Sequence, residues 1–312
     1  MRKNAPKPYR RLDKADRIAI ERGLDKRKPC RRMARELGRS PSTIADEVAR
    51  NRRVCRGPNK GGRAAKAPDD ACPRLLEWPR CCNGCRFRRY HCSRRWRCEY
   101  SAARAQALAD ACEMDTVIGL KSDRRCLLTL YLRAFRFQLA LPMPDKTAAL
   151  TGSALDMLEK AAPKAFRRLL PLLLTDNGAE FADCEGIERS SIDPAARRCS
   201  VFYCDARQSQ QKGDCERNHV EVRKILPKGR GISFDRLTGR DCAVLMSQLN
   251  SEPRPSLGGM CAIDMLLAAL GADGRELLDA LGVEKVAYEE PDMTLRAIEA
   301  ARRGRGEGPL VP

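Results

Sequence analysis

Residues 169–178 read Leu-Leu-Pro-Leu-Leu-Leu-Thr-Asp-Asn-Gly, an apolar run that ends in an acidic turn. An apolar run of this length between turn residues is typical of a strand buried inside a sheet. Asp176 follows the run directly, and a carboxylate in that position is costly unless it is paired or bound to a cation. The segment therefore predicts a buried strand at 169–175 with a functional carboxylate at its end.

The segments on either side predict the rest of an α/β core. Three apolar, strand-like runs precede this strand, and leucines at helical spacing lie between them and it. A shorter strand and a second helix follow it. This order of elements is typical of a mixed sheet. The expected ranges are 113–120, 126–135, 137–142, 146–162, 169–175, 200–204 and 213–226, followed by a helical tail at 259–312.

Three carboxylates belong to elements that this core is expected to bring together. Asp115 lies in the first strand, Asp176 ends the fourth, and Glu216 lies in the last helix. Converging oxygen ligands suit Mg²⁺ or Mn²⁺. Two such ions activate an attacking water or 3′-hydroxyl and stabilise the leaving oxygen. Arg223, on the same helical face as Glu216, is expected to hold a DNA phosphate beside the ions. The alternative is structural, with the two aspartates as caps and the helix residues as a solvated face.

The net charge of +19 is concentrated in the first third of the chain. Residues 1–100 hold 30 Lys and Arg against 11 Asp and Glu, and the remainder is balanced. Such a segment neutralises phosphates and releases counterions, so it predicts contact with nucleic acid, with a solvated basic arm as the alternative. The sequence contains no run of roughly 20 apolar residues and no apolar segment after its basic start. We therefore expect no membrane span or signal peptide, and a cytoplasmic location.

An all-α helix-turn-helix is predicted within residues 1–53. Three short helices are expected, with Gly38 as the left-handed stop of the second and Ser40 as the N-cap of the third, where Pro41 occupies the first turn. A tight glycine turn before the last helix is typical of this motif, whose recognition helix places its first side chains on DNA. The expected DNA-binding residues are Arg35, Arg39, Ser42, Thr43 and Arg50.

The chain contains 16 cysteines, six of which lie within residues 72–98. In a reducing compartment this clustering favours a metal site over disulfide bonds. After a linker at 54–71, residues 72–100 are expected to form a small zinc knuckle built around a Cys-Asn-Gly-Cys turn. The expected ligands are Cys72, Cys82, Cys85 and Cys92, with Cys81, His91 and Cys98 as substitutes. Free thiols and a redox pair are the alternatives.

Residues 115–229 resemble the catalytic domain of the insertion-sequence-30 family of DDE transposases, in a branch that carries cysteines. Residues 33–44 resemble the family's N-terminal helix-turn-helix. The matching blocks of the catalytic domain follow one another in the family's order. They are 114–119 (Met-Asp-Thr-Val-Ile-Gly), 127–130 (Leu-Leu-Thr-Leu), 145–147 (Asp-Lys-Thr), 174–181 (Leu-Thr-Asp-Asn-Gly-Ala-Glu-Phe), 201–205 (Val-Phe-Tyr-Cys-Asp), 211–229 with Glu216, Asn218 and His219, and, further on, 249–251 and 254–258.

The resemblance implies an RNase H-like, integrase-type catalytic domain over residues 110–258. It also implies that Asp115, Asp176 and Glu216 form the metal-binding triad for Mg²⁺ or Mn²⁺. The expected activity is that of a bacterial DNA transposase, which binds the terminal inverted repeats of an insertion sequence and cuts and joins DNA there. Its expected partners are double-stranded DNA, at the element ends and the target site, and further copies of itself on that DNA.

Two features depart from the family pattern. Residues 45–48 read Ala-Asp-Glu-Val where the family tends to have Ser-Arg-Glu-Ile, which places Asp46 on the DNA-facing helix. Only 16 residues separate Cys98 from Asp115, so the second helix-turn-helix and linker of that branch are missing. Two alternatives stay open. One is a catalytically idle, internally deleted remnant that represses a full-length copy at the element ends, and the other is a metal nuclease of the same fold.

Overall fold

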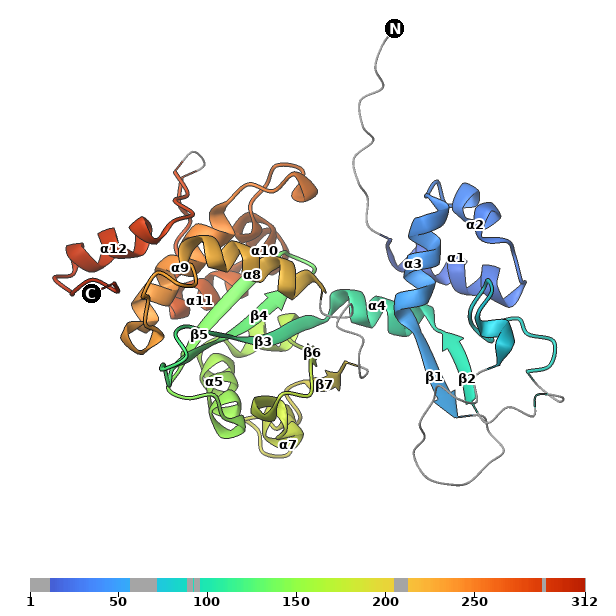
Figure 1. Cartoon of the computed structure of the whole chain (residues 1–312), viewed down its shortest axis with the longest axis horizontal. Coiled ribbons are helices and arrows are strands. Elements are labelled where there is room, and N and C mark those ends of the chain that lie inside the picture. The colour runs from blue at the N-terminus through green and yellow to red at the C-terminus, as the bar shows by residue number, and fades with distance from the viewer. Residues whose placement is uncertain are drawn as a thin grey trace, which may run out of the picture. The chain divides into compact units, whose positions relative to one another are not determined.

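The computed structural model describes residues 12–56, 72–88, 92, 96–204, 213–287 and 290–311. The chain divides into two compact units, Met1–Ala109 and Asp110–Pro312. Each unit has its own cluster of buried apolar side chains. Figure 1 draws the backbone of both units. Among the helices in the described ranges, none is long and apolar enough to cross a membrane.

The first unit begins with three short helices. They are α1 (Lys14–Asp25), α2 (Cys30–Glu36) and α3 (Pro41–Asn51). The Ser40 hydroxyl accepts a hydrogen bond from the Thr43 N–H at 3.1 Å and so caps α3. Gly38, with φ of 62°, ends the turn after α2 in the left-handed region. The three helices and these two signals confirm the prediction from the sequence.

A two-stranded antiparallel sheet completes this unit. β1 (Arg52–Arg56) pairs with β2 (Trp96–Tyr100), and α4 (Ala102–Asp110) follows. The first three residues of the expected linker therefore belong to β1, and residues 57–71 lie outside the described residues. The cysteine-rich segment lies between two paired strands, in the same compact unit as the three helices.

A polar network fixes these elements to one another. Arg17 of α1 donates to Glu47 of α3 and to Gln106 of α4, with 2.9 Å between the atoms in both cases. The Tyr100 hydroxyl donates to the same Glu47 oxygen at 3.2 Å. Burial, and then the negative charge of Glu47, raise the pKa of Tyr100, so its hydroxyl remains a donor. The position of α3 thus depends on contacts with α1 and β2.

The second unit is built on a mixed sheet in the order β5-β4-β3-β6-β7. Its strands are β3 (Cys112–Ile118), β4 (Cys126–Leu132), β5 (Phe137–Met143), β6 (Leu172–Thr175) and β7 (Ser200–Tyr203). The first three strands are antiparallel to one another, whereas β6 and β7 run parallel to β3. The predicted α/β core with a mixed sheet is therefore confirmed.

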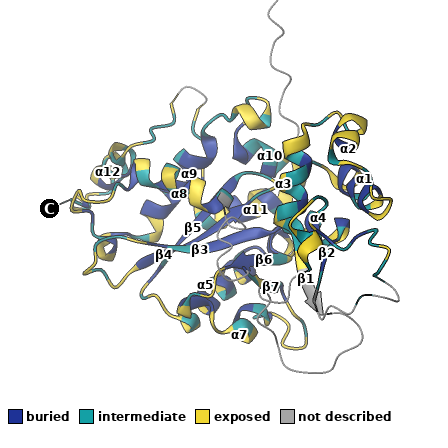
Figure 2. Cartoon of the chain, turned by 45° about the vertical axis from the view of Figure 1, so that its right-hand side comes forward, coloured by how far each residue is buried: buried dark blue, intermediate teal, exposed yellow. Residues whose placement is uncertain are grey.

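Helices cover both faces of this sheet. They are α5 (Ala148–Ala161), α6 (Pro163–Leu169), α7 (Cys184–Glu188), α8 (Gly213–Ile225), α9 (Gly239–Ser251), α10 (Ala262–Leu270), α11 (Ala272–Leu281) and α12 (Leu295–Gly304). On β5, the Gln138 side chain accepts a hydrogen bond from Asn218 of α8, whereas the Met143 side chain contacts Thr151 of α5. Because side chains alternate along a strand, these contacts assign α8 and α5 to opposite faces. Figure 2 shows the buried strands between the helices.

The helical tail expected at 259–312 shares the core of the sheet. Leu266, Leu277 and Ile298 all belong to the same buried cluster as the strands. Asp241 of α9 is fully buried, and its two oxygens accept from Arg302 and Arg305 at 2.5 and 2.6 Å. The boundary expected at 258 therefore does not separate two hydrophobic cores.

The expected strand at 169–175 is only partly a strand in the structure. α6 ends at Leu169 and β6 begins at Leu172. Phe166 and Leu169, three residues apart on one helical face, are both buried. Pro171 has no N–H and cannot continue the helix. The expected strand at 169–175 is thus corrected to 172–175. The expected strand at 126–135 ends at Leu132, because a turn with Arg136 at φ of 54° follows.

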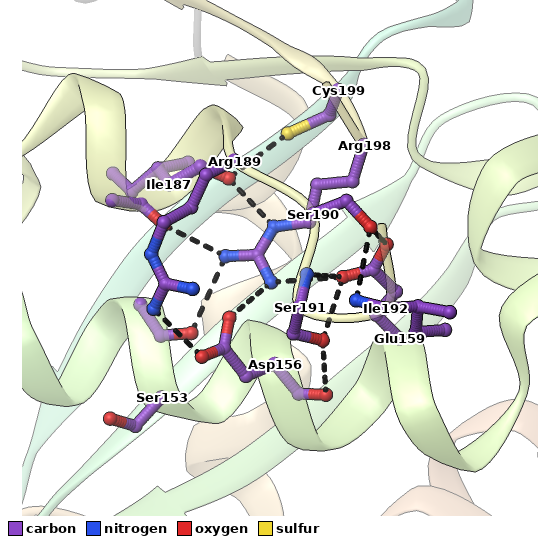
Figure 3. Close-up of polar contacts among 12 residues, drawn as sticks. Ser153, Asp156, Glu159, Ile187, Arg189, Ser190, Ser191, Ile192, Arg198 and Cys199 are labelled. Atoms are coloured by element: carbon purple, nitrogen blue, oxygen red, sulfur yellow. Dashed lines mark hydrogen bonds and ion pairs between the residues drawn. The ribbon is translucent and has the colours of Figure 1, made fainter. Parts of the chain in front are cut away.

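A buried arginine fastens the loop before β7 to α5 (Figure 3). The side chain of Arg198 is 1% exposed, and its Nη1 lies 2.6 Å from Asp156 and 3.4 Å from Glu159. Its remaining N–H groups donate to the carbonyl oxygens of Ile187 and Gly186 at 2.8 and 3.0 Å. These bonds satisfy a charge that would otherwise be very costly to bury. Arg198 therefore fixes the approach of the chain to the last strand of the sheet.

Candidate functional site

Two of the predicted carboxylates belong to neighbouring strands. Asp115 lies within β3, and Asp176 directly follows the last residue of β6. β3 and β6 are parallel, with Cys112 opposite Leu173 and Glu113 opposite Leu174. Continued two residues beyond these pairs, the register would lead to Asp115 and Asp176, which would then face the same side of the sheet. Oδ1 of Asp176 accepts from the Gly178 N–H at 3.0 Å, which holds the turn after β6.

A buried glutamate anchors α8 over this face. Glu113, two residues before Asp115 and so on the same side of β3, accepts a hydrogen bond from the Cys215 N–H at 2.5 Å. Its carboxylate also pairs with Arg133. Burial raises the pKa of Glu113, although Arg133 and the Cys215 N–H act in the opposite direction. A carboxylate at the first turn of a helix also stabilises the helix dipole. The start of α8 is thereby fixed beside Asp115.

Asp115, Cys215 and His219 form a group of possible metal ligands. One ligand atom from each residue lies within 4.8 Å of the other two. Among the described residues, no other set of three or more His, Cys, Asp or Glu side chains lies this close together. His219 places Nδ1 4.0 Å from Asp115 Oδ2 and Nε2 3.3 Å from Cys215 Sγ. The Thr129 hydroxyl lies 3.0 Å from Nε2. Sequence reasoning missed Cys215, although its i, i+4 spacing to His219 was the available signal.

Glu216 lies outside this group of three and is exposed on α8. It shares a flank of the helix with Arg223, whose Nη2 donates to the Ile118 carbonyl at the end of β3, at 2.7 Å. The other flank carries Asn218, which bonds to Gln138 of β5. Since β6 lies on the opposite side of β3 from β5, Glu216 is on the flank nearer Asp176.

Arg223, expected to hold a phosphate, is partly committed to the protein. Besides its bond to Ile118, its guanidinium lies over the ring of Phe234, 5.9 Å from the centroid. Burial lowers the pKa of Arg223 from its ordinary high value, which leaves it a cation near neutral pH. The charge is therefore fixed at the end of β3.

Glu180 supports the acidic turn from the other face of β3. Its Oε1 accepts from the Thr116 hydroxyl at 2.8 Å and lies 3.0 Å from Lys146 Nζ. A Cβ atom added at Gly178 would meet Glu180 Oε2 at 2.6 Å and Asp176 Oδ1 at 3.1 Å. A larger residue at position 178 would therefore displace the Glu180 carboxylate, which lies against the Asp-Asn-Gly turn. Glu180 is not among the site residues predicted from the sequence.

The cysteine-rich segment forms a tight turn at Cys82–Cys85. The Cys85 N–H donates to the Cys82 carbonyl at 3.1 Å, and the Cys98 N–H donates to Cys82 Sγ at 3.3 Å. Burial raises the pKa of Cys82, and the thiols of Cys85, Cys92 and Cys72 act in the same direction, so the four are electrostatic neighbours. In the described part of the chain, no three of these sulfur atoms lie within 4.8 Å of one another. His91 lies outside the described residues.

This turn is packed against α1. The Asn83 amide donates to Asp25 at 3.2 Å and to the Tyr100 carbonyl at 3.1 Å, and its oxygen accepts from the Tyr100 N–H. A Cβ atom at Gly84 would lie 2.5 Å from the carbonyl oxygens of Leu24 and Asp25. Gly84, at φ of 65°, is therefore required both by its conformation and by the closeness of α1.

The predicted DNA-binding residues of the first unit divide into two kinds. Arg35, Ser42 and Arg50 are exposed, and Thr43 is half-buried. Arg39 is only 12% exposed, because its Nη2 pairs with Asp16 of α1 at 2.8 Å. Arg39 thus ties the turn between α2 and α3 to α1, whereas the side chains of Arg35, Ser42 and Arg50 are exposed to solvent.

Comparison with known proteins assigns the three helices. Residues 8–51 match a family described as a helix-turn-helix domain. The first unit carries a helix-turn-helix domain. The chain is also similar to the transposase for insertion sequence element IS1086 of Cupriavidus metallidurans, with 30% identity over 140 residues. That match spans 44% of this chain and 38% of the relative. Among solved structures, the catalytic core domain of BIV integrase has a TM-score of 0.35 and 16% identity, over 52% of this chain and 95% of that one.

Proposed function

We propose that this chain is a DNA transposase with an RNase H-like core, which binds the terminal inverted repeats of an insertion sequence and cuts and joins DNA with divalent metal ions. The observation that carries the proposal is the parallel pairing of β3 with β6, because the same register, continued by two residues, would put Asp115 and Asp176 in adjacent positions. The helix-turn-helix domain and the similarity to a transposase support DNA as the substrate.

The carboxylates of the proposed site fit Mg²⁺ or Mn²⁺. Asp115 and Asp176 supply hard oxygen ligands from two strands, and Glu216 would complete the set from the flank of α8 on their side. A bound ion there supplies the positive charge that activates an attacking hydroxyl and stabilises the leaving oxygen. Glu113 and Glu180 hold α8 and the acidic turn in position on opposite faces of β3. Arg223 adds a fixed positive charge toward which a DNA phosphate is attracted.

The direct test uses DNA that carries the inverted repeats flanking this reading frame. We expect strand cleavage at the repeat ends in Mg²⁺ and none in a chelator. Binding without cleavage would instead favour the repressor remnant, for which the helix-turn-helix match of residues 8–51 is the supporting observation. Cleavage of DNA that lacks the repeats, at an equal rate, would favour a nuclease of the same fold.

The exposed residues of α3 should affect DNA affinity without affecting folding. Arg50→Ala is expected to weaken binding and to reduce the slope of log K against log salt by about one, since one phosphate contact is lost. Arg39→Ala is expected to lower the melting temperature, because it breaks the ion pair with Asp16. Gel shifts at several salt concentrations and thermal melts separate the two effects.

Arg275→Ala, an exposed arginine in α11, is the control for charge alone. If Arg50→Ala and Arg275→Ala bind DNA equally well, α3 does not contact the phosphates.

We also propose that Cys72, Cys82, Cys85 and Cys92 bind a structural zinc ion. The N–H to sulfur bond from Cys98 and the electrostatic coupling of the four thiols support this site. Four sulfur ligands about 2.3 Å from the ion would draw the sulfur atoms closer together. Zinc would then hold the turn that packs on α1, and so stabilise the helix-turn-helix.

Cys85→Ser is therefore expected to lose one equivalent of zinc and to lower the melting temperature of the first unit. Cys30→Ser, which replaces a half-buried thiol of α2 outside this set, is expected to keep the zinc. Elemental analysis and melting curves measure both effects. Structural zinc sites of this type bind the ion tightly. A purified wild-type chain that holds less than about half an equivalent of zinc would therefore contradict the proposal.

A further inference from the structure

Soft metal ligands stand beside the proposed Mg²⁺ site. Cys215 contributes a thiol and His219 an imidazole, one helical turn apart on α8, and both face Asp115. Hard cations such as Mg²⁺ do not select sulfur or imidazole, whereas Zn²⁺ does. We propose that Asp115, Cys215 and His219 form a zinc-type cation site, and that zinc bound there competes with Mg²⁺ for Asp115. The competition rests on the proposed function, whereas the zinc site itself does not.

The geometry of the three residues is close to what zinc requires. With Zn–S and Zn–N bonds of about 2.3 and 2.0 Å, tetrahedral ligands lie about 3.5 Å apart. Cys215 Sγ lies 3.3 Å from His219 Nε2. One donor atom from each of the three residues lies within 4.8 Å of the others. The 4.0 Å approach to Asp115 Oδ2 is made by the other ring nitrogen, Nδ1, so the imidazole and the carboxylate must both turn to share one ion through a single ring nitrogen.

The scaffold that carries these donors is fixed before any ion binds. The Cys215 N–H is held by buried Glu113, and Asn218 is bonded to Gln138 of β5. Both contacts hold α8 against the face of the sheet to which Asp115 belongs. A preformed arrangement lowers the free-energy cost of assembling a metal site.

The three donors of the site differ in their exposure to solvent. Cys215 is fully buried, whereas the side chains of Asp115 and His219 are 21% and 20% exposed. A cation therefore enters past the carboxylate and imidazole and reaches the thiol last. Three protein ligands leave a fourth position for water or another oxygen ligand, as in open zinc sites. Since Asp115 belongs to both sets, zinc and the Mg²⁺ pair cannot use it independently.

Cobalt titration of the full chain tests the site without relying on catalysis. Co²⁺ bound to a thiolate absorbs in the near ultraviolet, so each sulfur-containing site adds to the spectrum. We expect Cys215→Ser to lose the near-ultraviolet absorption of about one cobalt–thiolate bond relative to wild type, at a Co²⁺ concentration that saturates the wild type. Cys242→Ser, an equally buried thiol in α9 outside the group, is expected to match the wild type.

His219→Gln keeps the test decisive if Cys215→Ser fails to fold. It leaves the thiol in place and removes the imidazole, and its Co²⁺ affinity at this site is expected to fall by at least about tenfold, since loss of even a supporting partner of a ligand costs about 10–100-fold. Equal cobalt stoichiometry and affinity in wild type, His219→Gln and Cys242→Ser would overturn the site.

Zinc inhibition of DNA cleavage tests the competition. We expect low concentrations of Zn²⁺ to inhibit the Mg²⁺-dependent reaction of the wild type, and inhibition of Cys215→Ser, measured relative to its own zinc-free rate, to need at least about tenfold more zinc. Equal inhibition of the two would overturn the competition. A chain that binds cobalt through Cys215 but never cuts DNA would contradict the proposed function and still support the site.

Discussion

Asp176→Asn is expected to lose Mg²⁺-dependent cleavage and strand transfer while it keeps the DNA affinity of the wild type. The substitution removes one negative charge from the proposed metal site, directly after β6 and next to the strand that carries Asp115. Loss of electrostatic stabilisation at a reacting centre costs at least about 10²–10³-fold in rate. DNA affinity arises from phosphate neutralisation by a different unit, so its salt dependence should not change. A cleavage assay and a gel shift on the same repeat-end DNA measure both quantities.

Asp279→Asn supplies the matched control, because it makes the same charge change at an exposed position of α11. It is expected to cut DNA like the wild type. Normal cleavage by Asp176→Asn would refute the assignment of the metal site. If neither the wild type nor the control cuts DNA that both bind, the repressor remnant becomes the better account of the chain.

Arg198→Met is expected to destabilise the second unit by about 3–5 kcal/mol, because removal of one partner leaves buried carboxylates without their cation. Asp156 and Glu159 both lose a guanidinium contact, and the carbonyls of Gly186 and Ile187 lose their donors. Urea unfolding monitored by circular dichroism measures the change as a lower midpoint.

Arg189→Met is the control from the same network, since Arg189 also pairs with Asp156, at 2.9 Å, but is 52% exposed. An exposed pair contributes about 0–1 kcal/mol, so this variant should unfold near the wild-type midpoint. Equal midpoints for the two arginine variants would show that burial of Arg198 does not determine stability here.

The network also predicts acid sensitivity. Burial alone would raise the pKa of Glu159, but hydrogen bonds from Ser190 and Ser191 lower it below its ordinary value. A carboxyl with a lowered pKa in the folded state stabilises the fold above its unfolded pKa of about 4.3. That contribution is lost as the pH falls through the lowered value. The difference in midpoint between wild type and Arg198→Met should therefore shrink in acid.

The sequence predicted the sheet well because its strands are buried and strongly apolar. All seven residues of β4 are buried and only Thr129 among them is polar, and the order of strands and helices was sufficient to indicate a mixed sheet. The prediction was wrong at Leu169–Pro171, where leucines that belong to α6 are followed by leucines that belong to β6. Composition alone does not distinguish a buried helix end from a buried strand.

The candidate site was predicted unevenly for a similar reason. Asp115 and Asp176 stand out because acidic residues interrupt or directly follow apolar strands, and those two strands pair in parallel. Cys215 and Glu180 did not stand out, because a cysteine in a helix and a glutamate after a turn are both ordinary in sequence. Only the packing of α8 and of the 176–181 turn on β3 gives them neighbours. Arg39 shows the converse, since an arginine expected on DNA pairs with Asp16 instead.

The pairing of β3 with β6 also constrains the order in which the molecule is made. β3, β4 and β5 are consecutive in the chain and form their ladders locally, whereas Glu113 meets Leu174 only after a long intervening segment has been synthesised. Contacts between distant residues form late, since loop closure must come first. A nascent chain emerging from the ribosome would therefore fold its DNA-binding unit well before Asp176 can reach Asp115. If the proposed function holds, each newly made molecule would be able to attach to nearby DNA before it is able to cut it.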